Sequence, residues 1–409
     1  MIVRRHSRSD NRSGTADHRS GLTGIISSNR PWAMFLLYAA TVIGLPAQNL
    51  TALHSFDGTD GANPYAGLVQ ATNGRLYGTT VGGGAFGGGT VFRITTGGKL
   101  TTLYSFCAQS GCTDGLNPYA GLVQATNGHF YGTTALGGAN NRGTVFTITA
   151  SGKLTTLHSF DGSDGSQPEG GLTQSANGDF YGTTAFGGAN NDGTVFTITA
   201  EGKLTTVYSF NGIDGSQPRG GLTLAANGDL CGTTWAGGTS NGGTIFCLTP
   251  NHPITPLYSF PDSAHPVALI QATDGDFYGA TYDGGASGAG TVFKITPSGT
   301  LTVVYSFCAQ AGCPDGKNPD GGFIQATNGD FYGTTWAGGA NNGGTIFQIT
   351  PSFKFTTTSL CAQSACPVGE HPVGLVQDTN GDFYGTAYSG GANSDGTVFS
   401  LSVGLSPFV

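Results

Sequence analysis

The chain has 409 residues, of which 71 are glycine and only 10% are charged, and its formal net charge is −8. This length would ordinarily suggest two or three domains, but a sustained internal repeat makes each copy one unit of a larger architecture. An acidic surface repels nucleic acid and anionic lipid, so we expect neither as a partner.

The first 47 residues differ in composition from the rest of the chain. Six arginines precede the apolar stretch PWAMFLLYAATVIGLPAQ, which begins at Pro31. Its apolar core of about 15 residues suits a signal peptide better than a membrane span of about 20. We predict a secretory signal with a basic leader at 1–47, cleaved near Ala47, and the alternative is an uncleaved N-terminal anchor. Cleavage would remove six Arg and two Asp and leave a formal charge of −12.

A repeat with a period of 47 to 54 residues follows this segment. The third copy shows its four β-prone runs, LTTLHSF, GGLTQSA, DFYGTT and GTVFTIT, which are separated by turn signals. Asn-Gly or Asp-Gly follows the second run and favours a tight hairpin turn. The seven copies begin at Leu50, Leu100, Leu154, Leu204, Ile254, Leu301 and Phe355.

Four antiparallel strands repeated at this spacing are typical of a β-propeller. A solenoid would need capping units, which we do not find in the sequence. The first run at 50–56 has no partner strands before it, and the last copy stops at 396–403 without an outer run of its own. We therefore predict an all-β, seven-bladed β-propeller of four-stranded antiparallel blades over 48–409. The N-terminal outer strand would pair with the C-terminal blade and close the ring.

The motif set NGDFYGTT…GG…GTVF.IT..GKLTTLYSF resembles the GloVer tandem repeat, which is found in exported bacterial proteins that end in varied surface anchors. The resemblance covers residues 50–403 and implies export and a β-propeller type of repeat, but no defined activity. The chain ends in GLSPFV rather than in a hydrophobic tail, so we do not expect anchoring through the C-terminus.

The long connections of such a propeller share one rim, where binding residues are commonly found. Seven polar residues on this rim each precede a proline just before the innermost strand and should surround the mouth of the central channel. We predict that they bind a ligand through hydrogen bonds, and the alternative is that they cap backbone groups in the proline turn. They are Asn63, Asn117, Gln167, Gln217, His265, Asn318 and His371.

Aromatic residues at the start of the middle loop extend this candidate ligand site. Their faces would suit the apolar faces of sugar rings, and the alternative is packing between neighbouring blades. The smaller Val81 and Ala135 stand at the same position in two consecutive copies and should leave one side of the rim open. The predicted ligand-binding aromatic residues are Phe186, Trp235, Tyr282, Trp336 and Tyr388.

Acidic loops on the same rim are weak candidates for calcium binding. Calcium takes six to eight oxygen ligands, whereas Asp-Gly sequences also make ordinary turns. We expect no other cofactor. The candidate ligands are Asp57, Asp60, Asp161, Asp164 and Asp214.

A catalytic site should break the symmetry of the ring, and these acidic pairs repeat around it. The asymmetric group of His265, His371 and Asp283 supplies weak catalytic candidates, in which an imidazole could act as a general base.

The eight cysteines predict four disulfides and an oxidising compartment. Three pairs lie in CAQSGC-type loops, and the fourth would face across a hairpin in the fourth copy. Zinc would need four ligands in one place, whereas the pairs lie in different copies. The expected bridges are Cys107–Cys112, Cys231–Cys247, Cys308–Cys313 and Cys361–Cys366.

Together these features predict a secreted or cell-surface monomer that binds a polysaccharide or a surface protein through the long-loop rim. We expect binding rather than catalysis. The alternatives are a polysaccharide lyase or hydrolase that acts at the same rim, and a structural or adhesive cell-surface protein.

Overall fold

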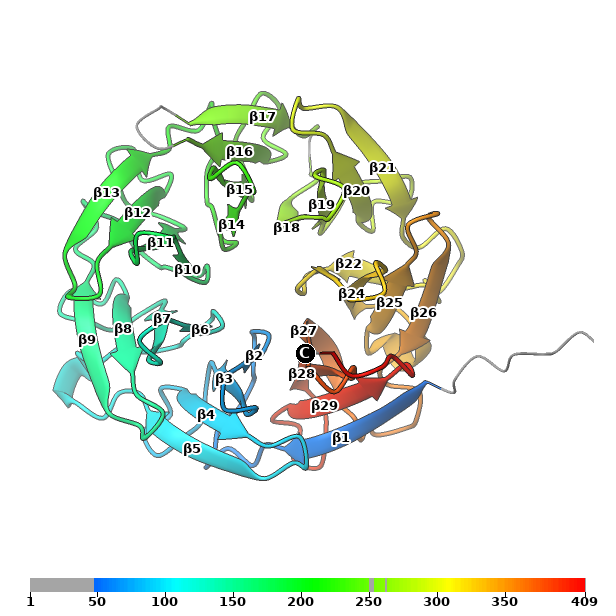
Figure 1. Ribbon diagram of the computed structural model, residues 1–409, viewed down its shortest axis with the longest axis horizontal. Helices are drawn as coiled ribbons and strands as arrows, with labels where there is room; N and C mark the ends of the chain where they lie inside the picture. Colours follow the sequence, from blue (N-terminus) through cyan, green and yellow to red (C-terminus); the bar gives the residue numbers. More distant parts are fainter. Residues whose placement is uncertain (1–47, 250–253, 262, 409) are drawn as a thin grey trace, which may run out of the picture. The chain divides into compact units, whose positions relative to one another are not determined.

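A computed structural model describes residues 48–249, 254–261 and 263–408, so the predicted signal peptide at 1–47 lies outside the described residues. Seven antiparallel sheets surround a central channel as the blades of a propeller (Figure 1). Within each blade the strands run in sequence order from the channel outward, except at the ring closure. The predicted seven-bladed fold is confirmed.

The first four blades each contain four strands, the innermost of which comes first in the sequence. Blade 1 contains β2 (Val69–Gln70), β3 (Leu76–Thr80), β4 (Thr90–Ile94) and β5 (Leu100–Ser105). Blade 2 contains β6 (Val123–Gln124), β7 (Phe130–Thr134), β8 (Thr144–Ile148) and β9 (Leu154–Ser159). Blade 3 contains β10 (Thr173–Gln174), β11 (Phe180–Thr184), β12 (Thr194–Ile198) and β13 (Leu204–Ser209). Blade 4 contains β14 (Thr223–Leu224), β15 (Leu230–Thr234), β16 (Thr244–Leu248) and β17 (Thr255–Ser259).

The last three blades differ slightly in their inner strands. Blade 5 contains β18 (Pro266–Gln271), β19 (Phe277–Thr281), β20 (Thr291–Ile295) and β21 (Leu301–Ser306). Blade 6 has a divided inner strand, β22 (Lys317–Pro319) and β23 (Ile324–Gln325), followed by β24 (Phe331–Ala337), β25 (Thr345–Ile349) and β26 (Phe355–Ser359). Blade 7 contains β27 (Glu370–Gln377), β28 (Phe383–Ser389), β29 (Thr397–Ser402) and β1 (Asn49–Ser55). Two short 3-10 turns, η1 (Ser110–Cys112) and η2 (Ala340–Asn342), lie in loops.

The ring closes through the first strand of the chain. Strand β1 pairs antiparallel with β29, with Asn49 opposite Ser402 and Ser55 opposite Thr397. The N-terminal run therefore becomes the outer strand of blade 7, as predicted. This pairing covers the exposed edge that β29 would otherwise present.

The hydrophobic core lies between neighbouring blades. At the junction of blades 2 and 3, Tyr131 stacks on Phe180 with ring centroids 4.1 Å apart, and both side chains are buried. Phe196 of β12 is fully buried in the same cluster. Each junction removes apolar surface from water in this way, which is the main favourable contribution to folding.

The glycine of the repeated FYGTT motif is required by this packing. A Cβ atom at Gly182 would lie 2.6 Å from Cζ of Phe196, which is closer than non-bonded carbons approach. The threonines that follow have a different role, because Oγ1 of Thr184 and Oγ1 of Thr194 are hydrogen-bonded at 2.8 Å between β11 and β12. The motif thus holds the two middle strands of a blade together.

Hydrogen bonds from the backbone and side-chain amides of the GGANND loop hold this connection between β11 and β12 in place. The backbone N–H of Gly187 donates to Oδ1 of Asn191 at 3.1 Å, and Gly187 has a φ of +79° that favours glycine. Nδ2 of Asn190 donates to the carbonyl oxygen of Phe210, which follows the outer strand. The loop therefore has a structural role, as the connection between the two middle strands of the blade.

All four predicted disulfides are present: Cys107–Cys112, Cys231–Cys247, Cys308–Cys313 and Cys361–Cys366. Structural disulfides persist in oxidising compartments, so they indicate an extracytoplasmic location. Over the described residues, no helix has the length and apolar character needed to cross a bilayer.

Candidate functional site

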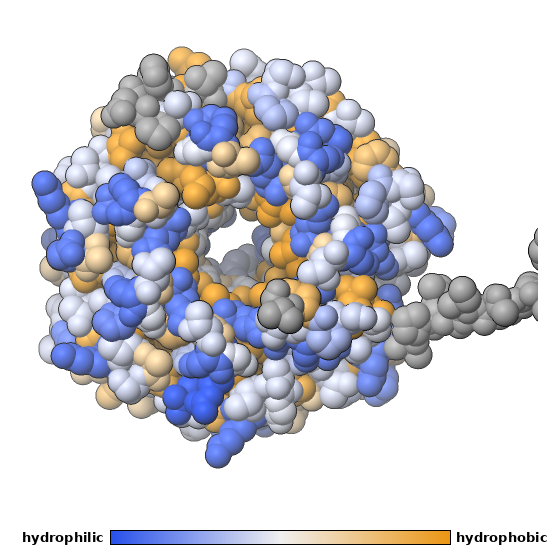
Figure 2. Space-filling model, viewed as in Figure 1, coloured by the Kyte–Doolittle hydropathy of each residue, from blue (hydrophilic) through white to orange (hydrophobic). Residues whose placement is uncertain are grey.

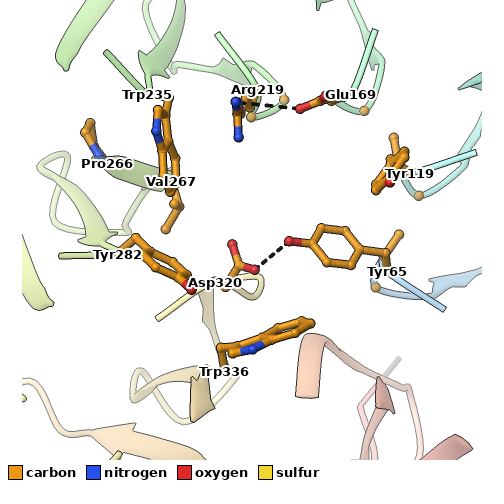
Figure 3. A pocket seen from close by; sticks show the side chains of 18 residues that line it. Tyr65, Tyr119, Glu169, Arg219, Trp235, Pro266, Val267, Tyr282, Asp320 and Trp336 are labelled. Atoms are coloured by element: carbon orange, nitrogen blue, oxygen red, sulfur yellow. Dashed lines mark hydrogen bonds and ion pairs between the residues drawn. The ribbon is translucent and has the colours of Figure 1, made fainter. Parts of the chain in front are cut away.

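The central channel widens into a cavity of about 670 Å³. In the space-filling view the opening lies at the centre of the ring, with hydrophobic residues around it (Figure 2). Aromatic and charged side chains converge on this cavity from several blades (Figure 3). The aromatic and charged residues that line it are Tyr65, Tyr119, Glu169, Arg219, Trp235, Tyr282, Asp320 and Trp336, and Pro266, Val267, two alanines and several glycines complete the lining.

Six of the residues that line the cavity come from one position of the repeat, the residue directly after the recurrent proline. The residue before that proline has a φ between 52° and 58° in all seven copies, and the proline ring then fixes its own φ. This turn directs the following side chain toward the channel. The wall residues from this position are Tyr65, Tyr119, Glu169, Arg219, Val267 and Asp320.

The polar residues before the proline were predicted to surround the mouth of the channel. None of them is among the residues that line the cavity, whereas six of the residues directly after the proline are. Nδ2 of Asn63 donates to the carbonyl oxygen of Tyr388, and Nδ2 of Asn117 donates to that of Val81, each across a blade junction. All seven donate their backbone N–H to a loop carbonyl of the preceding blade: Asn63, Asn117, Gln167, Gln217, His265, Asn318 and His371. These contacts match the capping alternative and join the blades.

The sequence does contain a signal for the wall position. The residue before the proline is polar in every copy, whereas the residue after it changes from tyrosine to glutamate, arginine, valine or aspartate. A position that varies within a constant turn is where a repeat protein can place specificity.

Three of the predicted aromatic residues, Trp235, Tyr282 and Trp336, line the cavity. Tyr388 lies beside them, with its ring centroid 5.3 Å from that of Trp336 and 5.8 Å from that of Tyr65. Together with Tyr65 and Tyr119, the first three give the cavity five aromatic lining residues, and Tyr388 packs against Tyr65 and Trp336.

Phe186 was included in the aromatic set, and this assignment was wrong by one residue. The backbone N–H of Ala185 donates to the carbonyl oxygen of Gln167, as that of Trp235 donates to Gln217. Phe186 pairs instead with Ser166. Ala185 therefore stands at the position of Trp235, and Phe186 is not among the residues that line the cavity. Three consecutive blades thus carry small residues here: Val81, Ala135 and Ala185.

A hydrogen bond crosses the channel between two wall residues. The hydroxyl of Tyr65 donates to Oδ2 of Asp320 at 2.7 Å, which joins blade 1 to blade 6 (Figure 3). Blade 7 lies between them and carries the smaller Val373 at the same repeat position. Burial raises the pKa of Asp320 to about 6, although the Tyr65 hydrogen bond and the positive charge of Arg219 oppose the increase. Burial, followed by the charge of Asp320, also raises the pKa of Tyr65.

A second polar pair joins blades 3 and 4 on the other side of the cavity. Nε of Arg219 lies 3.6 Å from Oε2 of Glu169, and the guanidinium carbon lies 5.0 Å from the ring centroid of Trp235. The Arg219 side chain is 42% exposed, so the ion pair contributes little to stability. Burial raises the pKa of Glu169, and Arg219 partly offsets this effect.

The candidate catalytic residues fall into two separate places. Nδ1 of His265 lies 2.9 Å from Oδ2 of Asp283, and its ring stacks on Trp235. His371 bonds through Nδ1 to the carbonyl oxygen of Trp336 and stacks on that indole. Blade 6 lies between blade 5, which carries His265, and blade 7, which carries His371. The structure brings His265 and Asp283 together but does not add His371 to them.

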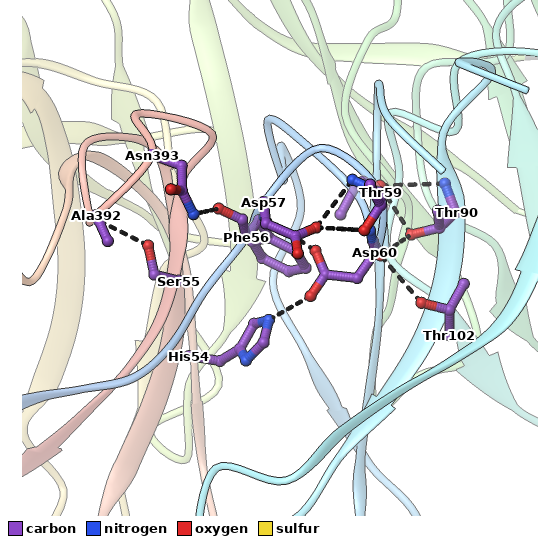
Figure 4. Close-up of polar contacts among 11 residues, drawn as sticks. His54, Ser55, Phe56, Asp57, Thr59, Asp60, Thr90, Thr102, Ala392 and Asn393 are labelled. Atoms are coloured by element: carbon purple, nitrogen blue, oxygen red, sulfur yellow. Dashed lines mark hydrogen bonds and ion pairs between the residues drawn. The ribbon is translucent and has the colours of Figure 1, made fainter. Parts of the chain in front are cut away.

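The acidic loops are built as turns (Figure 4). Oδ1 of Asp57 accepts hydrogen bonds from the backbone N–H and the hydroxyl of Thr59, and Oδ2 of Asp60 lies 2.7 Å from Nε2 of His54. Asp161 and Asp164 repeat this arrangement with Ser163 and His158, and Asp214 accepts from the hydroxyl of Tyr208. These contacts match the Asp-Gly turn alternative to calcium binding. Among the described residues, the only cluster of three side chains suited to metal ligation is Cys361, Cys366 and Glu370, and its cysteines form a disulfide.

Solved structures with the same fold include two lyases and the extracellular domain of a larger protein. A streptogramin B lyase is 18% identical, covers 87% of this chain and 97% of its own, and superposes with a TM-score of 0.62. A catalytically inactive virginiamycin B lyase from Staphylococcus aureus with quinupristin is 19% identical, with coverages of 87% and 99% and a TM-score of 0.63. The extracellular domain of a one-component system from B. thetaiotaomicron is 11% identical, with coverages of 87% and 40% and a TM-score of 0.59. Identities this low establish the shared fold alone.

At the level of sequence, no curated protein matches the chain. A family model does match, in two overlapping segments at residues 109–264 and 223–406. These segments include all strands of blades 2 to 6 and three of the four strands of blade 7, and they agree with the resemblance carried by the FYGTT and GTVF motifs. The chain belongs to the family of the Gloeobacter/Verrucomicrobia repeat.

Proposed function

We propose that this protein is an exported binding propeller whose central cavity holds a segment of polysaccharide. The observation that carries the proposal is the wall of the cavity, which combines five aromatic rings with two carboxyl groups and one guanidinium. Its volume of about 670 Å³ lies within the range of small-ligand sites. Aromatic faces stack on the apolar faces of sugars. Carboxylates accept hydrogen bonds from sugar hydroxyls, and a guanidinium donates hydrogen bonds to them.

The concave shape of the site favours a polysaccharide over a surface protein. Protein partners usually need broad interfaces of about 800 Å² on each side, whereas here the aromatic residues converge into a channel. The small residues Val81, Ala135 and Ala185 leave the sector of blades 1 to 3 without aromatic side chains at that position. We infer that a chain-like ligand enters across this sector and contacts Trp235, Tyr282 and Trp336 on the opposite side.

A glycan array with the purified exported protein tests this proposal. Trp336→Ala should lower the affinity for a bound glycan at least tenfold, because it removes one stacking face from the wall. Phe186→Ala is the matched control and should bind as the native protein does, since Phe186 does not line the cavity. Far-UV circular dichroism of each variant would verify the fold. An absence of binding to any glycan would overturn the proposal and favour a structural or adhesive role.

A polysaccharide lyase or hydrolase is the second candidate, and one observation favours it. Glu169 and Asp320 face the same cavity, and burial raises the pKa of both carboxyl groups. Hydrolysis of glycosides commonly uses two carboxyl groups, one of them protonated near neutral pH. Release of shorter products from a bound glycan, measured by mass spectrometry, would identify turnover, and its loss in Glu169→Gln would assign it to this cavity.

A further inference from the structure

The charges that face the cavity do not balance. Glu169 has a cationic partner in Arg219, at 3.6 Å. Asp320 has the Tyr65 hydroxyl on Oδ2, and among the described residues no Lys, Arg or His lies within ion-pair distance of it. Within the part of the chain that the structure describes, this carboxylate in the cavity therefore has no ion-pair partner.

The surroundings of Asp320 would hold a cation well. Tyr65, Tyr282 and Trp336 lie around its carboxylate in the cavity (Figure 3). The negative face of an aromatic ring attracts an ammonium or guanidinium group, most strongly where water is excluded. The cavity already contains one such contact, since the Arg219 guanidinium lies over Trp235.

The carboxylate is also oriented for a ligand. The hydroxyl of Tyr65 binds Oδ2 and holds the group in place, so Oδ1 remains to accept a second hydrogen bond. A charge-assisted bond from an ammonium to a fixed carboxylate is about twice as strong as a neutral one. A neutral hydroxyl would gain less from the same position.

We infer that the cavity selects a saccharide with a free amine, an amino sugar in its ammonium form, and that Asp320 is the residue that recognises it. This inference rests on the proposed function and names the class of its ligand. Tyr65 positions the carboxylate, and the rings of Tyr282 and Trp336 surround the ammonium. The site therefore distinguishes an amine from a hydroxyl at one carbon of a sugar.

Three β-1,4-linked tetramers form a matched set of probes, because they differ only at carbon 2. A glucosamine tetramer carries ammonium there, an N-acetylglucosamine tetramer carries a neutral amide, and a glucose tetramer carries hydroxyl. In isothermal titration calorimetry at pH 6.5, where a large share of the glucosamine amines is protonated and a large share of the Asp320 carboxyl, with its pKa of about 6, is ionised, we expect the exported protein to bind the glucosamine tetramer at least tenfold more tightly than the glucose tetramer. Asp320→Asn keeps the shape and the Tyr65 acceptor, and it should reduce this ratio to about one.

The pH dependence supplies a second readout. The groups that face Asp320 are Tyr65 and Tyr282, whose pKa values are raised, and Arg219, with Glu169 beyond it. Of these protein groups, only the two carboxyl groups titrate in the acidic range. The sugar amine becomes more fully protonated as the pH falls, so the expected decline of the preference below about pH 6 must come from protonation of a carboxyl group and not from the ligand. Glu169→Gln should retain that decline if Asp320 is responsible, and Asp320→Asn should abolish it.

Each outcome decides the inference. Equal affinity for the glucosamine and glucose tetramers would overturn it while leaving saccharide binding intact. A preference that persists in Asp320→Asn would also overturn it, because the amine would then be recognised elsewhere. If the glucosamine tetramer does not bind, the inference fails, and the glycan array decides separately on the proposed function.

Discussion

The hydroxyl oxygen of Tyr65 lies 2.7 Å from Oδ2 of Asp320, although 255 residues separate them in the chain. The closed ring makes this contact possible, because blade 1 and blade 6 are separated in space only by blade 7. The strand β1 that closes the ring leads directly into the loop that carries Tyr65. The position of Tyr65 in the central cavity therefore depends on the closure of the ring.

Removal of the Tyr65 hydroxyl should raise the pKa of Asp320 above its value of about 6. The hydroxyl stabilises the charged carboxylate, so Tyr65→Phe shifts the equilibrium toward the protonated form. The carbon-13 chemical shift of the Asp320 carboxyl, assigned with Asp320→Asn, would follow the titration. Tyr119→Phe removes a hydroxyl from the same cavity without breaking the bond to Asp320, and it should leave the titration unchanged. A Tyr65→Phe titration that matches the native one would contradict this account.

Asp320→Asn should stabilise the ligand-free protein at neutral pH and not at pH 3. The folded pKa of about 6 lies above the ordinary aspartate value, so the unfolded chain loses this proton more readily than the folded one. The native protein therefore loses stability as the pH rises from about 4 to about 6, by an amount on the order of 1–3 kcal/mol. The melting temperature of Asp320→Asn minus that of the native protein should increase over this interval and then level off. A difference independent of pH would show that the carboxylate is not destabilising.

The sequence allowed the fold to be predicted because every copy repeats the same physical requirements. Gly182 must be small beneath Phe196, and Asn177 and Gly178 make the hairpin turn, so the pattern identifies four strands without ambiguity. The wall of the cavity could not be derived in the same way. Whether Gln217 or Arg219 faces the channel depends on a positive φ before the proline. Phe186 was misaligned by one residue, since Ala185 and not Phe186 stands at the position of Trp235.

Contacts between distant blades were also beyond sequence analysis. The bond from Tyr65 to Asp320 depends on the diameter of the ring and on the small Val373 between them. The small residue can be read from the sequence, but the diameter of the ring cannot, so the contact could not be predicted. The disulfide between Cys231 and Cys247 was predictable because it lies within one hairpin, where the strand register fixes which residues face each other.

Gly182→Ala should destabilise the protein by about 1–3 kcal/mol, because the added methyl group overlaps the buried ring of Phe196. The midpoint of guanidinium chloride unfolding would measure the loss. Gly97→Ala is a suitable control, since Gly97 lies in an exposed turn where the nearest atom to an added Cβ is Oγ1 of Thr95 at 3.9 Å. The control should be neutral or slightly stabilising. Equal effects of the two substitutions would remove the packing explanation for the FYGTT glycine.

The bridge between Cys231 and Cys247 should contribute more stability than the bridge between Cys107 and Cys112. The first closes a loop with a sequence separation of 16 residues and the second one of 5, and the entropy removed from the unfolded chain increases with loop length. The double alanine variants should lose about 3 and about 2 kcal/mol respectively, as measured by guanidinium chloride unfolding without reductant. Cys231 is also almost fully buried between blades 4 and 5, so its replacement removes packing against Phe277 and increases the difference. Equal losses, or a larger loss for the shorter loop, would show that native-state contacts rather than loop closure determine what each bridge contributes.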